Sequence, residues 1–442
     1  MEIEQMKKEE FKRRRALLIE SLQDNSAVLL AGSAEVTRNS DCHFAYRQDS
    51  DFYYLTGFSE PKAFLLLLKE QGQARFILFN RPKNEKEELW EGVRAGHEGA
   101  MQLFNANESF DIALLNDKLP GFLAGKEHVY YRVARDNVVN EQLPVWMETL
   151  HQKVRLGVFA PKTFHDVSDL ISEMRLIKSE AEISVMRDVC LISANAHRRA
   201  MQAAAQCEYE YQLQANVHHE LMMHGCHHVA YNSIVAAGEN ACVLHYTENT
   251  SMIKSNDLIL IDAGGELDNY AADITRTFPK NGKFSEVQKA LYQVVLDAQK
   301  AGIALIQPGV VWTKIQEVMI DIISQGLLTL GILQGTLKEV VDNKAYQAFY
   351  MHNSGHWLCP DVHDQGAYKE QDQWRTLKAG MVLTVEPGIY IAAHHLDVDE
   401  RWHNIGIRIE DDILVTTDGH ENLTSAAPRE IVEIEALMCH AV

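Results

Sequence analysis

The sequence has few basic residues for its length and no apolar run long enough to cross a bilayer. Of its 442 residues, 62 are acidic and only 42 are lysine or arginine, which gives a formal charge of −20. Nucleic-acid-binding proteins normally carry a basic surface, so this balance argues against a nucleic-acid partner. The apolar run at 63–68 is far shorter than the ~20 residues that a membrane helix needs. We therefore expect neither a nucleic-acid nor a membrane partner.

Cysteine is scarce as well, and its pattern is informative. The seven cysteines are odd in number, irregularly spaced and include no Cys-x-x-Cys pair. A disulfide framework is therefore not expected, and a reducing compartment fits better. The segment Met1–Arg15 is highly charged and lacks the apolar stretch of a secretory signal. These observations predict a cytoplasmic protein.

The chain is too long for one ordinary domain, and its 46% hydrophobic and 24% charged residues are typical of globular proteins. The first part alternates apolar stretches with helical patterns, which predicts an α/β domain over residues 1–172. Within it, Asp51–Phe58 is interpreted as a packed strand and turn. The expected strands are 27–31, 63–68, 75–79 and 128–131, and the expected helices are 6–23, 84–104 and 138–153.

The pattern changes in the second part of the chain, residues 173–442. Capping boxes begin at Ser179 and Ser285, and each opens a helix. A further helix and strands that end in acidic residues follow each of them. This repeated order predicts a pseudo-duplicated α+β domain, in which two helix pairs pack on one antiparallel sheet.

The clearest strand of the second part is Asp257-Leu-Ile-Leu-Ile-Asp262, which runs into two glycines. Strong β-formers followed by glycines predict a buried strand and a tight hairpin. The chain is expected to return through a second strand, 270–278, so that Asp262 and Asp273 meet across the hairpin. Carboxylates beside so apolar a strand are costly to bury unless a cation meets them. The pair therefore indicates a metal site.

Two further strand ends carry Glu386 and Glu410, and a histidine-rich loop runs from His352 to His356. Four carboxylates and one imidazole suit two divalent ions, such as Mn²⁺, Co²⁺ or Zn²⁺. Two dications neutralise four negative charges. At a separation of about 3.5–4 Å they can share a bridging water and lower its pKa toward about 7. The product is a hydroxide nucleophile suited to hydrolysing an amide.

These signals also have simpler interpretations. A single acid at a strand end is usually a turn or cap residue, but four such acids with a histidine-rich loop weaken that explanation. For His245, in Leu244-His-Tyr-Thr-Glu-Asn249, local evidence leaves a catalytic role and a surface role equally open. A nucleophilic Cys359 is disfavoured because no oriented Cys-His-Asx series stands out.

Over nearly its whole length the chain resembles the bacterial aminopeptidase P (Xaa-Pro aminopeptidase) family of pita-bread metallopeptidases. The resemblance implies an α/β N-terminal domain and a pita-bread catalytic domain with a curved antiparallel sheet. The motifs that carry it are Glu35–Arg38, Tyr46–Gln48, Asp51–Phe58, Leu244–Asn249, Leu260–Gly264, Asp273–Phe278, His356–Leu358, Val362–Asp364, Thr384–Gly388 and Gly406–Asp411.

The same resemblance implies a ligand set. Asp262 would bind one metal, Asp273 and Glu410 would bridge both metals, and His356 and Glu386 would complete the coordination of the second metal. The family prefers Mn²⁺. One departure concerns the loop that begins at His352, where the family's usual His-Gly-x-x-His reads His-Asn-Ser-Gly-His.

The resemblance also implies roles around the substrate. His245 and His363 would assist at the scissile carbonyl, and Glu386 could handle the proton of the bridging water. Asp41 would lie near the amine of the substrate. Trp90 matches a residue that a neighbouring subunit contributes, so a homo-oligomer, either a dimer or a tetramer, is expected.

His352 and Arg408 would help to shape the pocket that holds the proline of the substrate. Arg408 would also support the catalytic site, and Tyr390 would contribute to substrate binding. A scissile Xaa-Pro bond has no N–H, so recognition must come from the shape of the ring and from the free N-terminus of the substrate. The resemblance therefore predicts peptide substrates that begin with Xaa-Pro.

The expected activity is two-metal hydrolysis that releases the N-terminal residue when proline is second. The closest alternative is prolidase, which shares the fold and ligands but accepts only Xaa-Pro dipeptides. A non-catalytic pita-bread module that binds peptides or proteins is a remote alternative, because such modules lose the metal-binding acids. A metal-free relative that acts on creatine-like substrates is disfavoured on the same ground.

Overall fold

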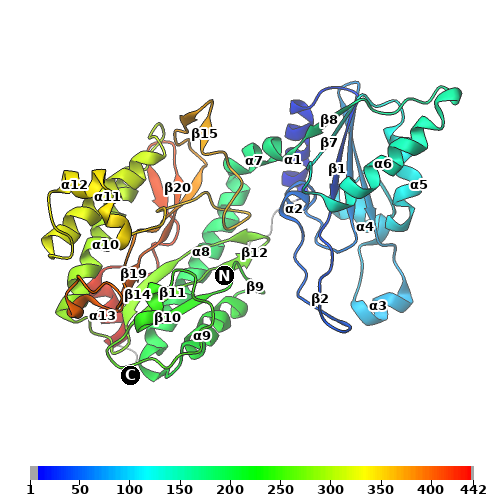
Figure 1. The fold of residues 1–442 in the computed structure, drawn as a ribbon. Helices are drawn as coiled ribbons and strands as arrows, with labels where there is room; N and C mark the ends of the chain where they lie inside the picture. Colours follow the sequence, from blue (N-terminus) through cyan, green and yellow to red (C-terminus); the bar gives the residue numbers. More distant parts are fainter. Residues whose placement is uncertain (1–7, 440–442) are drawn as a thin grey trace. The chain divides into compact units, whose positions relative to one another are not determined.

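The computed structural model describes residues 8–439 and divides them into two compact units between Met174 and Arg175 (Figure 1). The division falls within helix α7 (Ser168–Leu176). The boundary expected from the sequence lies two residues earlier, between 172 and 173. Among the residues described, no helix combines the length and apolar character needed to cross a membrane.

The first unit is built on a six-stranded sheet with the order β6-β5-β4-β1-β7-β8. Its central strand β1 (Ser26–Ala31) is antiparallel to β4 (Phe64–Glu70) and parallel to β7 (His128–Tyr131). The other elements are α1 (Lys8–Ser21), β2 (Thr37–Asn39), β3 (Cys42–His43), α2 (Ser50–Thr56), β5 (Gln73–Asn80), α3 (Glu85–Glu91), α4 (Gly96–Phe104), β6 (Glu108–Asp111), α5 (Leu115–Leu123), α6 (Asn137–His151) and β8 (Thr163–Asp166).

Apolar residues cover both faces of this sheet. Successive side chains of β1 point to opposite faces, so Val28 and Leu30 join one core cluster while Ala27 and Leu29 join another. Every residue of β1 is buried. The α/β domain predicted from the alternation of strands and helices is confirmed.

Two local predictions in this unit were wrong. Residues 51–56 form nearly all of helix α2, and Gly57 caps it, so this segment is not a strand. The carboxylate of Asp49 accepts a hydrogen bond from the Phe52 N–H, and Gly57, with φ 68°, ends the helix. These two caps outweigh the strand propensity of the aromatic residues between them. The expected helix 84–104 is divided into α3 and α4, because Gly92 leaves the helical conformation with φ 92°.

The second unit carries two helix pairs. Helix α8 (Glu180–Ala203) packs on α9 (Glu210–Met223), and α10 (Glu286–Ala304) packs on α11 (Thr313–Thr329). The capping boxes predicted at the starts of α8 and α10 are present. Two shorter helices, α12 (Leu337–Asp342) and α13 (Ile431–Cys439), complete the helical part.

The strands of this unit are antiparallel and are divided among several small sheets. They pair in the orders β10-β11-β14, β13-β12-β9, β17-β20-β21, β18-β19 and β15-β16. Together with the helix pairs, they confirm the predicted pseudo-duplicated α+β domain, although the strands form several small sheets instead of the single sheet expected. Their bounds are β9 (His228–Val229), β10 (Ile234–Ala237), β11 (Leu258–Asp262), β12 (Gly265–Leu267), β13 (Tyr270–Ala271), β14 (Thr275–Pro279), β15 (Lys369–Glu370), β16 (Gln373–Trp374), β17 (Val382–Val385), β18 (Gly388–Ile391), β19 (Ile405–Arg408), β20 (Asp411–Val415) and β21 (His420–Asn422).

The tight hairpin predicted after Asp262 was wrong. Strand β11 does pair with β14, but Asp262 stands opposite Thr275 rather than Asp273. Between these strands the chain makes a separate excursion, β12 and β13, which joins β9 in another sheet. Gly264 permits this path, because a Cβ there would lie 1.7 Å from the carbonyl oxygen of Ala272. Asp273 therefore follows the excursion and reaches the site just before β14.

Candidate metal centre

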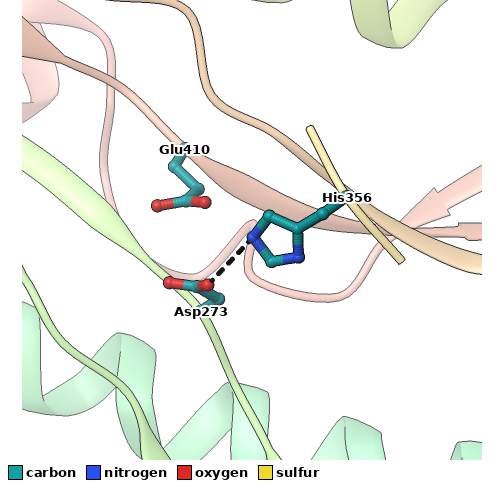
Figure 2. Close-up of side chains that lie close together, drawn as sticks. All are labelled: Asp273, His356 and Glu410. Atoms are coloured by element: carbon teal, nitrogen blue, oxygen red, sulfur yellow. Dashed lines mark ion pairs between the residues drawn. The ribbon is translucent and has the colours of Figure 1, made fainter. Parts of the chain in front are cut away.

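Three side chains from separate segments bring ligand atoms together. One ligand atom from each of Asp273, His356 and Glu410 lies within 4.8 Å of the others. Figure 2 shows the three side chains pointing toward one another, and the Nε2 atom of His356 lies 3.5 Å from the Oδ2 atom of Asp273. Asp273 precedes β14, Glu410 lies between β19 and β20, and His356 lies in the loop before β17. The tertiary structure thus gathers groups that are far apart in the chain.

Backbone bonds hold the histidine and a further glutamate on neighbouring segments. The Thr384 N–H donates to the carbonyl of His356, and the Glu386 N–H donates to the carbonyl of Ser354. The Oε1 atom of Glu386 lies 3.7 Å from the Nε2 atom of His356. Since Glu386 follows β17 directly, the end of this strand places its carboxylate beside the imidazole.

Asp262 completes the group of five residues that the sequence predicts as ligands. All five line one cavity of about 1040 Å³, and its lining residues all belong to the second unit. Thr275 connects two of them, because it pairs with Asp262 across β11 and β14, and its hydroxyl donates to the Oε2 atom of Glu410 at 2.7 Å. The Glu410 N–H in turn donates to the carbonyl of Thr275.

The electrostatics of the cluster are those of crowded, buried carboxylates. Burial, followed by the charges of Asp273, Glu386 and Asp262, raises the pKa of Glu410 well above its usual value. Burial and the neighbouring aspartates also raise the pKa of Glu386, to about 7, although His356 opposes this shift. Burial alone would lower the pKa of His356, but Asp273 and Glu386 raise it to about 9. Such a cluster strongly favours added positive charge.

Arg408 links the cluster to the residues predicted for the proline side of the site. Its guanidinium donates to the Oδ2 atom of Asp262 at 2.6 Å and to the Tyr390 hydroxyl at 2.9 Å. The same hydroxyl lies 2.9 Å from the Nε2 atom of His352. Burial and the charge of Arg408 lower the pKa of His352 to about 4. His352 is therefore a neutral imidazole at pH 7.

The two histidines predicted to act at the carbonyl both line the cavity. The ring of His363 lies 4.1 Å from that of His356, centroid to centroid. Burial, and then the charge of His356, lower the pKa of His363. His245 is exposed and lies in the loop after a 3₁₀ turn, Gly238–Cys242.

Asp41 and Trp90 lie elsewhere. Both belong to the first unit, and neither is among the residues that line the cavity. Asp41 lies in the turn between β2 and β3 and is exposed. Trp90 lies on α3, and 87% of its surface is exposed.

The sequence analysis missed Tyr231. Its hydroxyl lies 2.5 Å from the Oδ1 atoms of both Asp262 and Asp273, so one phenol connects the two aspartates. Burial and these two charges raise the pKa of Tyr231 well above its usual value. Tyr231 lies about thirty positions before its nearer partner in the chain, and no local motif marks it. Only the pairing of distant segments reveals this contact.

The donor atoms fit divalent metal ions. Carboxylate oxygens and a single imidazole nitrogen suit hard to borderline cations such as Mn²⁺, Co²⁺ and Zn²⁺. Bound cations would also compensate the mutual repulsion that raises the pKa values of Glu386 and Glu410. The chemistry of this cluster is therefore that of a metal centre for one or two divalent ions.

Comparisons with known proteins agree with this assignment. The model of metallopeptidase family M24 matches residues 184–417, and that of the aminopeptidase P N-terminal domain matches residues 11–130. The chain is 42% identical to an Xaa-Pro aminopeptidase of Escherichia coli strain K12, with 99% of both chains covered. It is 45% identical to an Xaa-Pro aminopeptidase of Haemophilus influenzae, with 98% of this chain and 97% of the relative covered.

Solved structures give the same result. The aminopeptidase PepP of Pseudomonas aeruginosa matches with a TM-score of 0.97 and 44% identity, and 99% of each chain is covered. A zinc-substituted aminopeptidase P of Escherichia coli in complex with product matches with a TM-score of 0.96 and 42% identity, and 99% of this chain and 100% of that chain are covered.

The fold and the cluster of ligand atoms define a pita-bread metallopeptidase with an additional N-terminal α/β domain. The chain belongs to metallopeptidase family M24 and, within it, to the bacterial aminopeptidase P group. The resemblance inferred from the sequence motifs is thereby confirmed.

Proposed function

We propose that this protein is an Xaa-Pro aminopeptidase, a metal-dependent hydrolase that releases the N-terminal residue from peptides with proline in second position. The observation that carries the proposal is the convergence of five predicted ligand residues on one cavity. The activity of the full-length relatives supports it. The remote alternative of a non-catalytic module would not need such a cluster of buried acids.

Two divalent ions would be held by this cluster, and Mn²⁺ is the metal we propose. Asp262 would bind one ion, His356 and Glu386 would bind the other, and Asp273 with Glu410 would bridge them. The closeness of Asp273 and Glu410, whose ligand atoms lie within 4.8 Å of each other and of His356, supports the bridging role. The chemistry that such ions supply when bound is acidification of a water molecule and stabilisation of negative charge on the scissile carbonyl.

The chain's own side chains would handle the peptide. His245 and His363 line the cavity and would donate hydrogen bonds to the carbonyl as negative charge develops on its oxygen. Glu386, whose carboxylate lines the cavity beside His356, would accept and return the proton of the attacking water.

Neutral His352, Tyr390 and Arg408 would form the proline side. Their hydrogen-bonded chain is fixed before any peptide binds, because the Tyr390 hydroxyl contacts both the His352 ring and the Arg408 guanidinium. A rigid wall suits a substrate that is recognised by the shape of its ring, since the scissile nitrogen of proline carries no hydrogen. Asp41, by resemblance alone, would contribute negative charge near the amine.

Substrate length distinguishes this proposal from prolidase. We expect an Xaa-Pro-Xaa tripeptide to be cleaved with a kcat/KM at least about tenfold above that of the matching Xaa-Pro dipeptide, because contacts beyond proline contribute to the transition state. Rates for both peptides on one preparation check this, with an Xaa-Ala-Xaa tripeptide as the control for proline selectivity. A preference for the dipeptide would favour prolidase.

We also propose a homo-oligomer in which Trp90 of one copy completes the cleft of another. The residues Leu89, Trp90 and Val93 support this proposal, because they are 82%, 87% and 85% exposed, and α3 has no buried residue. Exposed apolar residues grouped in this way are typical of an interaction surface.

A complementation experiment tests the shared cleft. Trp90→Ala is expected to lower kcat/KM for the tripeptide about tenfold, while Leu156→Ala, which truncates an equally exposed apolar residue of the same unit, leaves it unchanged. When Trp90→Ala is mixed and reassembled with the inactive Asp273→Ala variant, mixed oligomers should gain activity above the sum of the two parts. No gain on mixing would contradict a cleft shared between copies.

Finally, we propose a cytoplasmic location. The seven cysteines support it, since all of them are free thiols in the structure and five are at least partly buried.

A further inference from the structure

The position of His245 is set by its loop rather than by its own side chain. The imidazole is exposed and makes no hydrogen bond to any residue within 8–439. We use the name His245 loop for residues 237–251, which connect β10 to the segment before β11. A side chain that must reach a carbonyl oxygen in the cavity needs this loop to be held still.

One buried carboxylate ties the His245 loop together. The Oε1 atom of Glu210 accepts hydrogen bonds from the backbone N–H of Ala237 and from the side-chain amide of Asn240, both at 2.9 Å. Its Oε2 atom accepts from the hydroxyl of Tyr246 and from the backbone N–H of Ser251, both at 2.8 Å. The four donors come from the start, the middle and the end of the loop.

Glu210 itself belongs to a different element. It is the first residue of α9, its side chain is fully buried, and its own N–H donates to the carbonyl of Ser251. Burying a carboxylate is costly unless its lone pairs are satisfied, and it offers about four acceptor sites. All four donors lie in the His245 loop, and none lies in α9. The Glu210 carboxylate at the start of α9 therefore bonds to the His245 loop and does not cap its own helix.

Apolar packing on both sides of His245 orients the His245 loop. Leu244 and Tyr246 pack on a small apolar cluster that includes Leu260 and Tyr390, while His245 between them lines the cavity. Asn249 fixes the far end, because its side chain accepts from the Val235 N–H at 2.9 Å and donates to the Ser233 carbonyl at 2.8 Å. Tyr246, whose hydroxyl donates to Glu210, is the residue directly after His245 in the chain.

We propose that Glu210 is the positioning residue of His245. Its carboxylate holds the His245 loop in the one arrangement that presents the imidazole to the substrate carbonyl. This proposal rests on the role given to His245 in the proposed function. Glu210 is not among the residues that line the cavity, and its carboxylate bonds to none of the five predicted ligands, so its effect must pass through the loop.

A double-mutant cycle on the full-length, metal-loaded enzyme tests the coupling. In Glu210→Gln, the amide nitrogen replaces one carboxylate oxygen and cannot accept from the two donors that face it. We expect kcat for the tripeptide to fall about tenfold with little change in KM, since small misplacements of a catalytic group are costly. In the His245→Ala background the same substitution should change kcat less than about twofold, because coupled residues are not additive.

Hydrogen exchange gives a readout that does not depend on activity. In Glu210→Gln, amides of residues 237–251 should exchange at least about tenfold faster, while those of β11 and β14 keep their protection. The control is Glu435→Gln, which alters a largely buried carboxylate bonded to Lys283 and to the N–H of Phe284, outside the His245 loop. It should leave both exchange in 237–251 and kcat unchanged.

The outcomes are distinguishable. If His245→Ala is slow but the two effects on kcat multiply, or if exchange in 237–251 is unchanged, the positioning role of Glu210 is wrong. If His245→Ala keeps the wild-type kcat, the role of His245 in the proposed function fails, and the present proposal fails with it. Metal content should equal that of the wild type in every variant of the cycle.

Discussion

We expect removal of divalent metal to abolish Xaa-Pro hydrolysis, and addition of Mn²⁺ to restore it. We expect chelation and buffer exchange to lower kcat for the tripeptide more than about 1,000-fold, because the charge stabilisation that bound metals supply is worth several kcal/mol. The cations of the described cavity do not replace that charge, since Arg408 is already paired with Asp262 and protonated His356 with Asp273. Rates measured with the metal-free protein, and again after titration with Mn²⁺, check this result.

The recovery of activity should depend on the number of Mn²⁺ ions bound per chain and on the pH. Recovery should be complete at two ions per chain, and Ca²⁺ at the same concentration serves as the control. In the metal-free protein the pKa is about 9 for His356 and about 7 for Glu386. Below these values protons occupy the ligand atoms, so the apparent affinity for Mn²⁺ should rise with pH from 6 to 9. Full activity in a preparation shown to be free of metal would contradict the metal-dependent reaction.

The substitution Asp273→Ala is expected to reduce kcat about 1,000-fold and to remove at least one bound metal ion per chain. Asp273 contributes to the cluster of Asp273, His356 and Glu410, and we propose that it bridges both ions. Loss of a bridging ligand weakens both positions at once. Steady-state kinetics and metal analysis on the same sample measure the two effects.

Stability separates this effect from misfolding. Asp273 and Glu410 are both buried, and the charge of Asp273 contributes to the raised pKa of Glu410. Removing one of these carboxylates relieves repulsion in the metal-free protein. Its melting temperature should therefore stay within about 4 °C of the metal-free wild type, the shift that roughly 1 kcal/mol produces. Asp297→Ala, which removes a surface carboxylate on α10, is the control for kinetics and metal content. Wild-type activity of Asp273→Ala would refute the bridging role.

The site illustrates which contacts a linear pattern can predict. Asp262, Glu386 and Glu410 each stand at or next to a strand end, where an apolar run meets an acid, and this pattern led to all three. Tyr231 and Thr275 carry no such signal. Each matters only because strand pairing and chain crossing bring it beside two acids, Tyr231 beside Asp262 and Asp273, and Thr275 beside Asp262 and Glu410.

Two of the three wrong local predictions were made in the same way. Residues 51–58 and the segment after Asp262 were both interpreted from side-chain propensity and glycine content. In the first case, the caps Asp49 and Gly57 stabilise a helix in place of the expected strand. In the second, the chain after Asp262 joins β9 through β12 and β13 instead of closing a tight turn. Helix caps in the first case and pairing with a distant strand in the second override the propensities of the residues themselves.

By itself, the sequence determined the two-part architecture, the helix starts of the second unit and the acids of the metal centre. These features follow from local rules, because capping, hydrophobic periodicity and the cost of burying charge all act within a few residues. Only the tertiary structure decided which atoms meet. It placed Asp273 beside His356, joined Asp262 to Arg408, and enclosed the Glu210 carboxylate within the His245 loop. Contacts between distant segments depend on how strands pair and cross, and no local pattern records that pairing.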